Sequence, residues 1–281
     1  MADPHPSYTA DLELLRTAAV TAGIIAASYF RRDLKTWTKG ENASPVSEAD
    51  IVLDKFLNSA LTTARPSYGW LSEETVDDPV RMNHERVFIV DPIDGTRGFI
   101  KGDDSWTVSL AVVENGVPVA GVVFAPARDE MYAGCRGGGA TLNGAPLTRV
   151  RPPDRLRPLI PAAGAVHQEL QALGLDYTRG PAYASLAYRL VQVATGKLDA
   201  ALVRRGSSDW DIAGAAAILA ECGVAFEDAC MGGMRFNQAE VRHGALAAFG
   251  EVSLRNVLTG ALVKVYGCPE TQLDLERTTT S

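Results

Sequence analysis

The chain has few of the residues that build nitrogen and sulfur metal sites. Its 281 residues include only four cysteines and four histidines. No two cysteines have Cys-x-x-Cys spacing, and no two histidines have the spacing of ligands on one helix. We therefore interpret Cys135, Cys222, Cys230 and Cys268 as reduced thiols in a cytoplasmic protein, and not as a disulfide framework or a zinc site.

Long apolar runs and a basic excess are also missing. No stretch is apolar enough to span a bilayer, and Met1 to Ala10 lacks the basic front and apolar centre of a signal peptide. The 34 acidic residues exceed the 27 basic residues, which gives a formal charge of −7 and argues against a general nucleic-acid-binding surface. We expect a cytoplasmic protein that has no membrane partner and no general nucleic-acid partner.

What is present is the composition and periodicity of a mixed α and β protein, with 46% apolar and 22% charged residues. Apolar spacing predicts a helix over 10–31, and alternating or β-branched runs around an Asn115-Gly116 turn predict a hairpin. An Arg- and Pro-rich stretch at 150–158 predicts a connector between an α+β half (1–150) and an α/β half (151–281). The other elements we expect are helices at 47–64, 183–196, 211–222 and 251–261, strands at 87–90, 106–113, 117–124, 129–133, 198–203 and 245–249, and a polar loop at 36–45.

The segment Asp91-Pro92-Ile93-Asp94-Gly95-Thr96 carries the clearest chemical signal. It follows the apolar run Val87–Val90, so a strand ending there would present Asp91, and the turn at Pro92 would bring Asp94 back beside it. Two carboxylates and a turn carbonyl form an oxygen site that suits Mg²⁺ better than zinc. The neighbouring backbone amides suit a phosphate. The predicted chemistry is metal-assisted attack of water on a phosphate ester.

Three further acids lie at the ends of predicted elements. Asp50 and Asp211 each have the position of a helix-capping residue, and capping alone explains either of them. Glu73 follows a short apolar stretch. A helix cap requires only one acid, whereas Asp91-x-x-Asp94 offers two. Taken together, the five acids therefore favour a site for two or three metal ions.

The sequence resembles the inositol monophosphatase superfamily. The resemblance rests on Asp91–Thr96, Ser72-Glu73-Glu74 and Trp210-Asp211-Ile212-Ala213, and it extends from Ser44 to about Gly250. It implies an α/β (α+β) fold, the layered αβαβα sandwich of the inositol monophosphatase and fructose-1,6-bisphosphatase type. It also implies a phosphomonoesterase that uses two or three Mg²⁺ ions, is sensitive to lithium and acts on a small phosphorylated metabolite. Family members often form dimers, so a homodimer is consistent with the resemblance.

The resemblance also assigns roles to matching positions. The implied metal ligands are Glu73, Asp91, the Ile93 carbonyl, Asp94 and Asp211. Asp50, Glu73 and Thr96 are the implied catalytic residues, with Thr96 and Asp50 orienting the attacking water. The expected substrate contacts are Gly95, Thr96, Ser185, Arg204 and Asp211.

Three features bear on the substrate. Arg204 stands seven residues before Asp211, where inositol phosphatases tend to have a glutamate, and an arginine there favours a second anionic group. A solvated loop arginine is the simpler alternative. The stretch Lys39–Ser47 is similar to a loop of bisphosphate nucleotidases, whereas Arg97–Gly102 is similar to both nucleotidases and histidinol phosphatases. The sequence favours a 3′(2′),5′-bisphosphate nucleotidase. Inositol-1-phosphatase, histidinol-phosphatase and a regulatory protein that binds transcription machinery remain alternatives.

Overall fold

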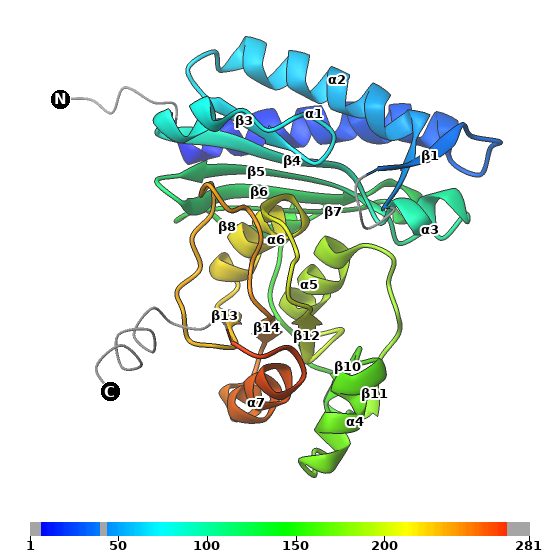
Figure 1. Ribbon diagram of the computed structural model, residues 1–281, viewed down its shortest axis with the longest axis vertical. Coiled ribbons are helices and arrows are strands. Elements are labelled where there is room, and N and C mark those ends of the chain that lie inside the picture. Colours follow the sequence, from blue (N-terminus) through cyan, green and yellow to red (C-terminus); the bar gives the residue numbers. More distant parts are fainter. Residues whose placement is uncertain (1–6, 40–43, 269–281) are drawn as a thin grey trace, which may run out of the picture.

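Two long helices cover the outer face of the largest sheet (Figure 1). The computed structural model describes residues 7–39 and 44–268. Helix α1 (Tyr8–Tyr29) and helix α2 (Glu48–Ala64) pack on each other and on the sheet. Their buried residues recur every three or four positions, as Leu15, Ala19 and Ala22 do in α1, so each helix has one apolar face that it buries against the strands. The helices predicted at 10–31 and 47–64 are thus confirmed.

The sheet beneath these helices has seven strands in the order β3-β4-β5-β6-β7-β8-β9. All neighbouring strands are antiparallel except β3 and β4, which are parallel. The turn between β5 and β6 has positive φ at both Asn115 and Gly116, as the predicted hairpin requires. The strands are β3 (Gly69–Ser72), β4 (Arg86–Asp94), β5 (Thr107–Glu114), β6 (Val117–Ala125), β7 (Glu130–Cys135), β8 (Gly139–Leu142) and β9 (Ala145–Pro146).

Three further layers lie on the other face of this sheet (Figure 1). Helices α5 (Leu186–Thr195) and α6 (Asp209–Glu221) form the middle layer. A second sheet follows, with β14 (Leu246–Phe249) between β12 (Ala200–Val203) and β13 (Ala225–Asp228), and α4 (Gly164–Ala172) and α7 (Arg255–Tyr266) lie outermost. This is the expected αβαβα sandwich. The short elements are β1 (Thr36–Lys39), β2 (Ser44–Ser47), α3 (Thr96–Ile100), β10 (Leu159–Ile160), β11 (Thr178–Arg179) and the 3-10 turns at Pro79–Asn83, Pro126–Arg128 and Val252–Leu254.

Two local predictions were wrong. The segment 36–45 is not a loop, because Thr36–Lys39 and Ser44–Ser47 pair as an antiparallel hairpin, and only residues 40–43 of the nucleotidase-like stretch lie outside the described residues. Strand β4 does not end at Val90 but continues to Asp94 through an irregularity in its pairing with β5. Pro92 is tolerated there because a bulge leaves a residue without its ladder hydrogen bond.

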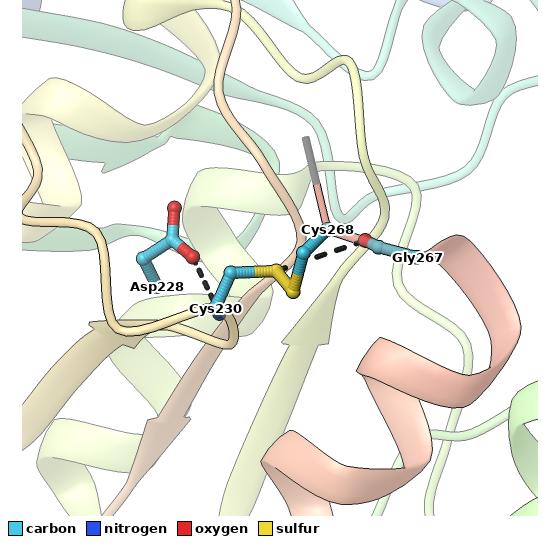
Figure 2. The surroundings of a disulfide bond; sticks show 4 residues. All are labelled: Asp228, Cys230, Gly267 and Cys268. Carbon is cyan, nitrogen blue, oxygen red and sulfur yellow. Dashed lines mark hydrogen bonds between the residues drawn. A yellow bond between two sulfur atoms is a disulfide. The ribbon is translucent and has the colours of Figure 1, made fainter. Parts of the chain in front are cut away.

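The interpretation of all four cysteines as thiols was also wrong. Cys230 and Cys268 form a disulfide with an S–S distance of 2.03 Å, across 38 positions of sequence (Figure 2). Neither spacing nor periodicity indicates this pair, because the end of α7 meets the turn after β13 only in the folded chain. Cys135 is buried and Cys222 is half-buried, and both are free thiols.

The segment after β9 is held in place by ion pairs to a buried aspartate. Arg151 and Arg155 pair with the two oxygens of the buried Asp199 carboxylate, at 2.9 and 3.1 Å. Asp199 precedes β12, so the connector predicted at 150–158 is anchored to the second sheet. The division of the chain at residue 150 stays a prediction.

Among the described residues, no helix is both long enough and apolar enough to cross a membrane.

Candidate active site

A group of three carboxylates, two buried and one half-buried, lies where the end of β4 meets the start of α6. Asp91, Asp94 and Asp211 each offer an oxygen, and these oxygens lie within 4.8 Å of one another. In the pairing of β4 with β5, Asp91 lies opposite Ser109 and Asp94 lies opposite Thr107. The interval of three residues in β4 therefore faces an interval of two residues in β5. In a regular strand, residues three apart point to opposite faces. The extra residue therefore allows Asp91 and Asp94 to serve one site.

The turn after β4 requires a glycine. Gly95 has φ +91, and a Cβ atom at this position would lie 2.9 Å from the backbone of Ala184 and of Ser185. The next residue, Thr96, begins α3 and places its hydroxyl 3.1 Å from Asp50 Oδ1 and 3.0 Å from the Ile93 carbonyl oxygen. The structure thus brings Asp50 and Thr96 together beside the motif.

Three acids of the site, Asp94, Asp211 and Asp50, are each fixed by hydrogen bonds from a helix N-terminus. Asp94 Oδ2 accepts from the Ser185 hydroxyl at 2.5 Å and from the Ala187 amide at 2.7 Å, both at the start of α5. Asp211 Oδ2 accepts from the Ser208 amide at 2.7 Å in a capping box that opens α6. Asp50 forms the equivalent box with Ser47 at the start of α2. Capping and membership of the site are therefore compatible, because the bonds that cap the helix also orient the carboxylate.

The Ser185 side chain contacts the acidic group from the start of α5. Its side chain is fully buried, and its hydroxyl is shared between Asp94 and Thr107. In the structure it orients the Asp94 carboxylate. A direct contact with substrate stays a prediction.

The electrostatics of the site favour a bound cation. Burial raises the pKa of Asp94 to about 6 and that of Asp211 to about 7. Burial also raises the pKa of Asp91 well above its usual range, and the charges of Glu73 and Asp94 act in the same direction. Carboxylates that crowd each other in this way are stabilised when a cation neutralises them. An all-oxygen, anionic group of this kind fits Mg²⁺.

Glu73 lies beside the three aspartates at the end of β3. Its backbone amide donates to the Val90 carbonyl oxygen at 3.2 Å, next to the start of the motif. Lys39 Nζ lies 3.2 Å from Glu73 Oε1 and 2.6 Å from Glu74 Oε1. Burial raises the pKa of Glu74 to about 7. The sequence predicted a role for Glu73 but gave no sign that Lys39 bridges it to Glu74.

A cavity of about 450 Å³ opens directly from the acidic group. Asp94 and Asp211 line one part of it, and the arginines Arg179, Arg189 and Arg204 also line it. Arg204 is exposed at this position, so it is both a solvated arginine and a cavity residue. Arg179 and Arg189 were not predicted. For Arg189 a signal existed, because it is the one charged residue in the helix-forming segment 185–196.

The model of the inositol monophosphatase family matches residues 8–258. The chain belongs to this family. The inositol monophosphatase family consists of Mg²⁺-dependent phosphomonoesterases, so the chain is a phosphoric monoester hydrolase. The all-oxygen donor set of the acidic group agrees with that metal.

Similar proteins span several branches of the inositol monophosphatase family. An inositol-1-monophosphatase of Mesorhizobium japonicum is 32% identical over 261 residues, covering 88% of this chain and 94% of the relative. The 3′(2′),5′-bisphosphate nucleotidase CysQ of Escherichia coli K12 is also 32% identical, over 68% of this chain and 78% of the relative. The crystal structure of the extragenic suppressor protein suhB from Bartonella henselae superposes with a TM-score of 0.78 at 29% identity, covering 91% of this chain and 99% of that one. Identity alone does not separate these branches.

Proposed function

We propose that the protein is a Mg²⁺-dependent 3′(2′),5′-bisphosphate nucleotidase that converts 3′-phosphoadenosine 5′-phosphate to AMP. The observation that carries this proposal is the cavity beside the acidic group, which has three arginines in its lining. A substrate with one phosphate needs cationic partners only at the metal site. Arginines farther along the cavity favour a second anionic group on the same molecule.

The roles of the acidic residues are part of the proposal. Glu73, Asp91, Asp94, Asp211 and the Ile93 carbonyl would hold the Mg²⁺ ions. When bound, the ions would polarise the phosphate ester, lower the pKa of the attacking water and stabilise the leaving oxygen. The support is the 4.8 Å clustering of three of these side chains and the raised pKa values of Asp94 and Asp211.

The remaining motif residues would handle the water and the phosphate. The Thr96 hydroxyl, 3.1 Å from Asp50 Oδ1, would accept a hydrogen bond from the water while it donates its own proton to Asp50. The backbone amides of Gly95 and Thr96 would hold the phosphoryl oxygens at the start of α3. Asp211 would contact the substrate as well as the metal.

A phosphate-release panel tests the proposal. The purified protein is assayed with Mg²⁺ on 3′-phosphoadenosine 5′-phosphate, inositol-1-phosphate, histidinol phosphate and fructose 1,6-bisphosphate. We expect the highest kcat/KM on 3′-phosphoadenosine 5′-phosphate. A higher value on any other member of the panel would refute the nucleotidase assignment.

The second candidate is hydrolysis of inositol-1-phosphate. The relative from Mesorhizobium japonicum, which is named for that activity, aligns over 88% of this chain and favours this candidate. The discriminating residue is Arg204, because an arginine offers no acceptor to a sugar hydroxyl.

If the protein binds Mg²⁺ but hydrolyses no member of the panel, the result supports the regulatory alternative instead.

A further inference from the structure

Asp209, a buried aspartate two residues before Asp211, joins the start of α6 to the segment 237–243. It is the first residue of α6 and is 1% exposed. His243 Nε2 donates a hydrogen bond to Asp209 Oδ1 at 2.6 Å, and the Asn237 amide donates to Asp209 Oδ2 at 2.7 Å. Asp209 is not among the described residues that line the cavity, so its place in the fold indicates a role other than contact with substrate.

The chain around His243 pairs with the chain that enters α6. The His243 amide donates to the Ser207 carbonyl oxygen at 2.8 Å, and the next residues, Ser208 and Arg242, form an antiparallel bridge. Ser208 in turn donates its amide to Asp211 Oδ2 at 2.7 Å. The residue that orients the Asp211 carboxylate is therefore held by the segment that carries His243.

The segment 237–243 is also tied to the first sheet, through Arg81. The Arg81 side chain is 2% exposed and lies in the 3-10 turn after β3, eight residues beyond Glu73. Its Nη1 atom donates to Asn237 Oδ1 at 2.6 Å. Because the Asn237 amide donates to Asp209, one chain of hydrogen bonds runs from the loop after Glu73 to the first turn of α6.

The burial of Asp209 makes its hydrogen bonds to this segment important. A buried carboxylate that loses a donor is left with an uncompensated charge, which is strongly unfavourable. The His243 side chain is 8% exposed and its ring lies 5.0 Å from the Phe236 ring, so packing holds the imidazole in place. Without that donor, Asp209 would have to move toward water. Asp211 would move with it, because the two residues share one turn of α6.

We propose that His243 is a positioning residue for the phosphatase reaction, and that it acts through Asp209 to set the place of Asp211 relative to the acids of β4. This rests on the proposed role of Asp211 as a metal ligand. His243 contacts neither the metal nor the substrate. Its loss should therefore change the Mg²⁺ requirement more than the recognition of the organic part of the substrate.

The test measures how phosphate release depends on Mg²⁺ concentration. The wild type, His243→Ala and His243→Gln are assayed on the panel member that the wild type hydrolyses fastest. His243→Ala should raise the Mg²⁺ concentration for half-maximal activity by about tenfold, the lower end of the range for residues that support metal ligands. His243→Gln should restore most of the loss, because its amide can place an N–H donor near the position of Nε2. At saturating Mg²⁺ the KM for substrate should change by less than about twofold.

His167→Ala is the matched control. The His167 ring is also hydrogen-bonded and packed, both against Tyr177, but it lies in α4 in the outermost layer. This variant should lower the melting temperature and leave the Mg²⁺ requirement unchanged. Equal shifts of the Mg²⁺ requirement in both alanine variants would overturn the proposal, because a general loss of stability would then explain them. An unchanged requirement in His243→Ala, or no recovery in His243→Gln, would overturn it as well.

Calorimetric titration with Mg²⁺ separates this inference from the proposals on which it rests. The titration needs no substrate, so its result holds whichever member of the panel is hydrolysed. Asp211→Asn tests the metal-ligand role alone, and Mg²⁺ binding equal to that of the wild type would refute that role. If Asp211→Asn binds Mg²⁺ more weakly and His243→Ala binds it as the wild type does, the ligand role stands and the positioning role of His243 is overturned. Weaker binding by both variants supports the positioning role.

Discussion

Asp91 is the most deeply buried of the three carboxylates in the acidic group. It is 1% exposed, and its Oδ1 accepts the Ile93 amide at 3.1 Å, which fixes the carboxylate beside the Ile93 carbonyl. Asp91→Asn keeps the shape of the side chain and removes its charge. We expect Mg²⁺-dependent phosphatase activity to fall by about a thousandfold, because a neutral amide is a poor Mg²⁺ ligand.

The control for Asp91→Asn is Asp129→Asn. Asp129 is exposed and has φ +51, a conformation that asparagine also adopts readily. This variant should retain full activity. Activity of Asp91→Asn within about tenfold of the wild type would contradict the metal-ligand role.

The second prediction concerns Arg204, whose exposure limits the fall in kcat/KM that we expect from its substitution. Because Arg204 is solvated, a contact between it and an anion would be weaker than a buried pair. Arg204→Glu should lower kcat/KM for a bisphosphate by about five- to tenfold, and should have less effect on a monophosphate. Steady-state kinetics on the two substrates measure this, and equal losses on both would show that Arg204 does not select.

The raised pKa values of Asp94, about 6, and of Asp211, about 7, predict a pH dependence of stability. A folded-state pKa above the unfolded value means that the folded protein holds more protons, so stability is greatest at low pH and declines as pH rises through the folded-state pKa. Between about pH 5 and 8 the melting temperature of the metal-free protein should therefore fall.

Excess Mg²⁺ is the control for the pH prediction. It binds the ionised carboxylates, so it should raise the melting temperature more at about pH 8 than at about pH 5. A metal-free melting temperature that rises over this range would contradict the assignment of buried, mutually repelling acids.

At the scale of elements, the disulfide ties the end of α7 to the turn after β13 (Figure 2). The bond closes a loop across 38 positions, and the chain-entropy model gives about 3–4 kcal/mol for a loop of this length. The double variant Cys230→Ser, Cys268→Ser should lose stability of this order in chemical denaturation without reductant.

Cys222→Ser, which removes a half-buried free thiol, is the matched control and should cost less. Reductant should destabilise the wild type and leave the double variant unchanged. Equal stability of wild type and double variant under oxidising conditions would show that the bond does not form in solution.

The sequence predicted elements well where one local pattern decides the structure. The capping boxes Ser47–Asp50 and Ser208–Asp211 and the Asn115-Gly116 hairpin are local features, and the structure has each of them. The β4 bulge depends on pairing with β5, so the run Val87–Val90 alone could not reveal it. The disulfide and the place of Arg189 in the cavity are likewise set by tertiary contacts, which a single sequence does not display.

At the scale of the whole molecule, the site depends on close packing between a strand of the first sheet and a helix of the middle layer. A Cβ atom at Gly121 of β6 would lie 2.3 Å from the Gly214 carbonyl oxygen and 2.9 Å from the Ala217 Cβ atom of α6. Gly121→Ala must push α6 away from the sheet, so we expect a loss of about 1–3 kcal/mol of stability.

Because α6 carries Asp211, the displacement in Gly121→Ala should also weaken Mg²⁺ binding. Calorimetric titration with Mg²⁺ and thermal melting measure the two effects. Gly260→Ala is the control, since its added Cβ would have no described atom within 4 Å other than its chain neighbours and its own helix backbone, and alanine favours the α7 helix. If Gly121→Ala binds Mg²⁺ as the wild type does, the position of Asp211 does not depend on this contact.

The hydrogen bonds from the start of α5 to Asp94 have a consequence for which molecules fit. Arg189 follows Ser185 by four residues in the same helix, and Ser185 is bonded to Asp94. The axial rise between these residues is about 6 Å. One turn of α5 therefore separates Ser185, which holds Asp94, from Arg189. A substrate with two anionic groups would then be selected by the spacing between those groups.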